Sequence, residues 1–123
     1  RNLAGMEARL EAGAKELAGV FPEVESEIIE GLLESVEGVL TTELLRELQE
    51  LAGDEELAMR EASVEEGGIS LDTTGKPIPL GTFIVFTSEI SVYGLAVKPP
   101  TGKQLLSHYA FKADEEGPYS VSA

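Results

Sequence analysis

The spacing of the apolar residues changes once along this sequence, at the pair Gly67–Gly68. Before this pair, apolar side chains recur every three or four residues, which places them on one face of an α-helix. After it, they alternate with polar residues or form short continuous runs, as they do in β-strands. A chain whose helices precede its strands is expected to fold as α+β rather than as a parallel α/β sheet.

The first half of the chain predicts three long helical segments. Apolar residues share one helical face over 3–20, over 24–40 and over 44–51. Pro22 suits the first turn of the second helix, because proline is tolerated where a backbone N–H has no helical partner. Gly53 suits the end of the third helix, because glycine readily adopts the left-handed conformation that closes a helix.

Capping residues mark two further helix starts in this half. Thr41 or Thr42 can cap the third helix through its hydroxyl oxygen. Asp54 can cap a short fourth helix around Leu57 and Met59. The sequence therefore predicts three to four N-terminal helices.

The second half predicts four to five strands. They are expected at 69–71, 83–86, 90–97, 105–111 and 119–121. The run 83–86 is apolar at every position, which is typical of a strand that is covered on both faces. We expect these strands to form an antiparallel β-meander, with the helices packed on one of its faces.

The acidic residues are concentrated in the first half of the chain. Residues 1–123 have the length of one domain, with a net charge of −14. Residues 1–66, the acidic half, carry 18 acidic and 5 basic side chains, a net −13. Residues 67–123, the near-neutral half, carry 5 acidic and 4 basic side chains, a net −1. Nucleic acids and anionic membranes are bound through Lys and Arg, so we expect neither as a partner.

Composition excludes several kinds of chemistry. The chain has no Cys, so it forms no disulfide and contains no thiol nucleophile. This composition favours the cytoplasm without excluding export. No apolar run is long enough to span a bilayer. Because the chain begins with Arg1 rather than Met, we expect it to derive from a longer gene product.

Two short motifs resemble catalytic loops but are incomplete. Gly102–Lys103 lacks the earlier glycine and the following Ser or Thr of a phosphate-binding loop, since Val97 and Gln104 occupy those positions. The segment 72–75, Asp-Thr-Thr-Gly, has the composition of a polar β-turn. Neither motif predicts an active site.

His108 is the only histidine, and Tyr109 follows it in a predicted strand. No nucleophile motif accompanies it, so a hydrogen-bonded strand histidine is the simpler interpretation. If the chain instead binds a small molecule between its helices and its sheet, Tyr93, His108 and Tyr109 are the candidate polar groups. The closely spaced Asp and Asn residues of calcium loops are missing, and we expect no metal and no cofactor.

Small residues cover much of the surface of the first helix, among them Ala4, Ala8, Ala12 and Gly19. Such a surface allows a second helix to approach closely, from the same chain or from a second copy. With no catalytic set present, the sequence favours a non-catalytic interaction or assembly subunit that is homo-oligomeric. A virion, appendage or complex component, or a small adaptor, fits this description.

Two other functions remain open at this stage. One is a small-molecule-binding or enzyme domain with its pocket between helices and sheet. The other is an acidic inhibitor that mimics nucleic acid and blocks a basic protein, for which the net charge is suitable.

Overall fold

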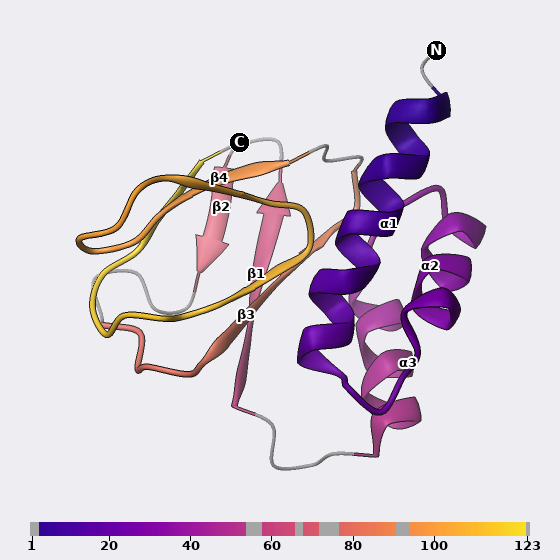
Figure 1. Cartoon of the computed structure of the whole chain (residues 1–123), viewed down its shortest axis with the longest axis horizontal. Coiled ribbons are helices and arrows are strands. Elements are labelled where there is room, and N and C mark those ends of the chain that lie inside the picture. The colour runs from indigo at the N-terminus through magenta and orange to yellow at the C-terminus, as the bar shows by residue number, and fades with distance from the viewer. Residues whose placement is uncertain (1–2, 54–57, 66–67, 72–76, 91–93, 123) are drawn as a thin grey trace.

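The computed structural model describes residues 3–53, 58–65, 68–71, 77–90 and 94–122. Over these residues, three helices lie along one side of two β-sheets (Figure 1). The α+β class predicted from the sequence is therefore confirmed.

The three helices follow the apolar stripes of the sequence, but the second begins only at Ser26, so Pro22 precedes it rather than lying in its first turn. They are α1 (Leu3–Val20), α2 (Ser26–Ser35) and α3 (Thr42–Ala52). α1 and α2 lie side by side, and the short connection over 21–25 makes them antiparallel neighbours (Figure 1). The start of α1 therefore lies beside the end of α2.

Local chemistry sets the ends of α2 and α3. Thr41 caps α3, because its Oγ1 accepts the backbone N–H of Leu44 at 3.1 Å. Gly53 closes α3 in the left-handed conformation, with φ of 67°. After α2, Glu37 and Gly38 both have positive φ values, 56° and 78°, and reverse the chain toward α3. The predicted cap and the predicted stop of α3 are both confirmed.

The strands form two sheets. The larger sheet has the order β2–β1–β3–β6, with β1 at Met59–Glu65, β2 at Gly68–Leu71, β3 at Phe83–Ser88 and β6 at Ala110–Lys112. The smaller sheet has the order β5–β4–β7, with β4 at Leu95–Lys98, β5 at Leu105–Ser107 and β7 at Ser120–Ser122.

The predicted antiparallel meander is corrected in two respects. β1 and β3 are parallel, and the strands are divided between two sheets. The fourth helix predicted around Met59 is also wrong, because Met59 begins β1. Asp54 and Leu57 lie outside the described residues. β1 contains many helix-forming residues, but pairing with β2 on one side and β3 on the other determines its conformation.

The segment 105–111 also differs from its prediction as one strand. It contains β5 and the start of β6, which belong to different sheets and are separated by His108 and Tyr109. The strand predicted over 90–97 is shorter, since β4 begins at Leu95.

Two apolar cores lie on opposite faces of the larger sheet. The first lies between this sheet and the helices, and it includes Val85 together with residues such as Leu17 and Leu33. The second lies between the two sheets and includes Ile84 and Phe86. Successive residues of β3 therefore enter different cores, which confirms that this apolar run is a strand covered on both faces.

Candidate functional site at the corner between the sheets

The break between β5 and β6 forms a corner, at which the chain leaves the smaller sheet and enters the larger one. Three consecutive backbone N–H groups of this corner donate to the carboxylate of Glu16 on α1. The backbone nitrogen of His108 lies 3.0 and 3.1 Å from the two carboxylate oxygens of Glu16. The nitrogens of Tyr109 and Ala110 lie 2.7 and 3.1 Å from Oε1. Charged acceptors form strong hydrogen bonds, so Glu16 fixes the corner against α1.

Tyr109 inserts its ring between α1 and the loop that follows α2. Its side chain is buried, and its hydroxyl donates a hydrogen bond to the Gly38 carbonyl oxygen at 2.7 Å. Gly13 provides the space for the ring on α1. A Cβ atom at Gly13 would lie only 2.2 Å from ring carbons of Tyr109. The ring and the helix backbone are therefore in direct contact.

The charge state of Tyr109 follows from its surroundings. Burial raises the pKa of the Tyr109 phenol above its ordinary value of 10.0. The positive charge of Arg9 acts in the opposite direction, and the negative charge of Glu16 raises the pKa further. The phenol is therefore neutral at pH 7, and its single proton is donated to Gly38.

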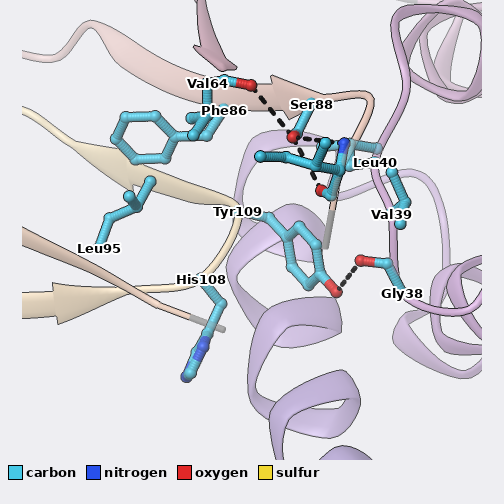
Figure 2. Close-up of a pocket in the computed structure, with 10 residues that line it drawn as sticks. Gly38, Val39, Leu40, Val64, Phe86, Ser88, Leu95, His108 and Tyr109 are labelled. Carbon is cyan, nitrogen blue, oxygen red and sulfur yellow. Dashed lines mark hydrogen bonds between the residues drawn. The ribbon is translucent and has the colours of Figure 1, made fainter. Parts of the chain in front are cut away.

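A small cavity lies beside Tyr109, between the loop after α2 and apolar side chains such as Phe86 and Leu95 (Figure 2). The cavity has a volume of about 10 Å³, which is room for about one water molecule. The Tyr109 ring extends toward Gly38, whereas the His108 imidazole extends in another direction. The two side chains therefore do not converge on a common point.

The polar groups around this cavity are used within the fold. The Ser88 hydroxyl lies 2.8 Å from the Ile90 carbonyl oxygen and 3.1 Å from that of Val64, and it accepts the Ile90 N–H. Among the residues that the structure describes, no group of three or more His, Cys, Asp or Glu is arranged to hold a metal ion. The corner joins helices to sheets, and its geometry provides no nucleophile and base in contact.

The three candidate ligand-binding residues are placed as follows. His108 and Tyr109 both line the cavity, at the corner between β5 and β6. Tyr93 lies outside the described residues. The prediction that the three bind a ligand together therefore stays a prediction.

A different surface lies immediately before the corner, on β5. This strand is at the edge of the smaller sheet and pairs only with β4 among the described strands. Leu105 and Leu106 are 42% and 65% exposed. Edge strands offer unpaired backbone groups, and two exposed leucines add apolar surface beside them.

The small-residue face predicted on α1 is also at the surface. Ala8, Ala12 and Gly19 are exposed, and a Cβ atom at Gly19 would meet no heavy atom within 4 Å. The side chain of Ala4 is outside the described set. Ala8, Ala12 and Gly19 are therefore not used for packing inside the described part of the chain, and the role of this face in an oligomer stays a prediction.

Comparison with known proteins gives no relative: no family model, no curated protein and no solved structure matches the chain. Within the described residues, none of the helices is both long enough and apolar enough to cross a membrane.

Sequence reasoning missed Glu16 and the exposure of the β5 leucines. Glu16 could not be found, because its partners lie 92 or more residues further along the chain. Gly13 is a partial signal of the contact with Tyr109. A glycine inside a helix lowers helix stability, so its presence indicates a close contact that leaves no room for a side chain.

Proposed function

We propose that this chain is a non-catalytic assembly subunit that associates with further copies of itself through the β5 edge. The observation that carries the proposal is the exposure of Leu105 and Leu106 on an edge strand. A leucine that becomes fully buried contributes about 1.5–3 kcal/mol. Leu105 and Leu106 are consecutive in the strand and therefore lie on opposite faces of the sheet. Leu106, the more exposed of the two, is the centre of the proposed interface, because a few buried side chains supply most of the binding energy.

The position of these leucines in the chain supports self-association. The near-neutral half carries a net charge of −1, whereas the acidic half carries −13. Contact through the near-neutral half avoids bringing the most strongly charged surfaces of two copies face to face.

The α1 face of Ala8, Ala12 and Gly19 is a second candidate interface for the same function. Each of these residues has little apolar surface to bury, so the face gains less per residue than the leucines of β5. The β5 edge is therefore the stronger candidate.

The geometry gives less support to a ligand-binding function between the helices and the sheet. Pockets for small molecules have volumes of about 300–1,000 Å³. The cavity beside Tyr109 has about 10 Å³ and admits no such ligand without rearrangement. The nucleic-acid-mimicking inhibitor stays a hypothesis that rests on net charge alone.

Sedimentation velocity over a wide range of protein concentration tests the proposal. The variant Leu106→Lys should weaken self-association by about tenfold or more, because it places a charge at the apolar centre of the interface. Leu51→Lys is the matched control, since Leu51 is 57% exposed at the end of α3, away from β5. This control should associate as the wild type does.

Two results would contradict the proposal. A wild-type chain that stays monomeric at the highest concentration is not an assembly subunit. A Leu106→Lys variant that associates as tightly as Leu51→Lys would place the interface elsewhere.

A further inference from the structure

A groove lies between the start of α1 and the end of α2. It has a volume of about 390 Å³, which is within the range of ligand-sized pockets. Its apolar lining is Met6 and Leu10 from α1. Its acidic lining is Glu7 and Glu11 from α1, and Glu30 and Glu34 from α2.

The glutamates of this groove have few ion-pair partners among the described residues, although the guanidinium of the buried Arg9 lies against Gly38, just beyond the end of α2. Glu11 forms an ion pair with Lys15 at 3.5 Å. Glu7, Glu30 and Glu34 form no ion pair with any residue that the structure describes. Glu34 also lies in the last turn of α2, which contains no basic residue. The end of a helix carries partial negative charge, so a carboxylate there is unfavourable and a cation would be favourable.

The segment Lys103–Leu106 has the complementary chemistry. All four of its side chains are exposed, and it combines one cation with two leucines. Lys103 forms no ion pair with any described residue. The segment therefore offers an apolar group for the lining of Met6 and Leu10, and a positive charge for the glutamates around it.

We propose that the groove between α1 and α2 receives the segment Lys103–Leu106 of a second copy of this chain. The inference rests on the proposed self-association and names the surface on which the β5 leucines dock. Leu106 packs against the half-buried Met6, above the core residue Leu10, while Lys103 lies near Glu34. The contact joins two different surfaces, one from each copy.

This arrangement differs from a symmetric pairing of two β5 edges. Symmetric pairing uses the same surface twice and stops at a dimer. A contact between two different surfaces leaves one of each unoccupied, so it continues into a ring or a filament. Size distributions should therefore extend beyond the dimer as concentration rises. The contact should also weaken with added salt, because its ionic part is exposed to screening.

Charge reversal on both sides of the contact tests the inference. Lys103→Glu and Glu34→Lys, each alone, should weaken self-association by about tenfold, because each places like charges together. Mixing the two variants, or combining both changes in one chain, should restore association to within about threefold of the wild type. Sedimentation velocity at low salt is the measurement.

Two matched controls separate this contact from general charge effects. Lys98→Glu changes another exposed lysine of the smaller sheet. Glu50→Lys makes the same change as Glu34→Lys, in the last turn of a neighbouring helix. Both controls should associate as the wild type does. Circular dichroism should show all variants folded, since each position is exposed.

The possible failures are distinguishable. A wild-type chain that is monomeric throughout overturns both the self-association and this inference. Association that is lost in Leu106→Lys but unchanged in Lys103→Glu and Glu34→Lys overturns the groove alone. Association that stops at a dimer and does not recover in the charge-reversed pair favours symmetric pairing of β5 edges, and it also contradicts the groove.

Discussion

Two neighbouring stretches of the chain, Leu105–Leu106 and His108–Ala110, lie in opposite environments. The first is exposed at the edge of the smaller sheet. The second is held by the Glu16 carboxylate, with the Tyr109 ring buried against α1. The exposure of the two leucines is therefore not explained by a lack of packing partners in this part of the chain. The comparison suggests a division of roles, in which the corner stabilises the fold and the edge is available for contact.

Gly13→Ala should break the corner most severely. The new Cβ atom would lie 2.2 Å from the Tyr109 ring, so helix or ring must shift. We expect the free energy of unfolding to fall by about 3 kcal/mol, measured by urea denaturation. Gly31→Ala on α2 is the control, because a Cβ atom there meets nothing within 4 Å. It should raise stability by up to about 1 kcal/mol through helix propensity. Equal effects of the two substitutions would contradict the packing described for Tyr109.

Glu16→Ala should have the next largest effect. It leaves three backbone N–H groups at the corner without their acceptor, and we expect a loss of about 2 kcal/mol in unfolding free energy. Glu11→Ala removes an exposed carboxylate of the same helix, whose ion pair with Lys15 contributes little. A loss no larger than that of Glu11→Ala would show that the corner does not depend on Glu16.

Tyr109→Phe should cost about 1 kcal/mol, because it removes the hydrogen bond to Gly38 and keeps the ring. The difference between wild type and variant should also depend on pH. The pKa of Tyr109 is raised on folding, so its contribution is fully present below about pH 10 and is lost as pH rises through the higher folded value. Urea denaturation between neutral and alkaline pH measures this difference. A difference in unfolding free energy that instead grows as pH rises would contradict a raised pKa of Tyr109 in the folded chain.

Leu106→Lys should have the smallest effect on stability, within about 0.5 kcal/mol of the wild type, because the side chain is mostly exposed. Its effect on self-association should be the largest of the four variants. Urea denaturation of dilute protein measures the first effect, and sedimentation at high concentration measures the second. A large loss of stability in the monomer would show that the edge also belongs to the core.

The sequence predicts those parts of the fold that local chemistry determines. The Thr41 cap, the Gly53 stop and the doubly covered apolar run of β3 all follow from residues close together in the chain. β1 was misassigned because its conformation depends on pairing with β2 and β3. The corner at His108 was missed because its partner, Glu16, is 92 residues away. Non-local contacts of this kind leave no periodic signal in a single sequence.

The central claim is that copies of the chain meet through the β5 edge, and hydrogen exchange tests it most directly. Amide exchange is compared between dilute protein and protein concentrated enough to associate. The account predicts slower exchange for the amides around Leu105–Ser107 in the concentrated sample than in the dilute one. The exchange rates of the α3 amides should be the same in the two samples. Unchanged exchange at β5 in a sample that associates would contradict it.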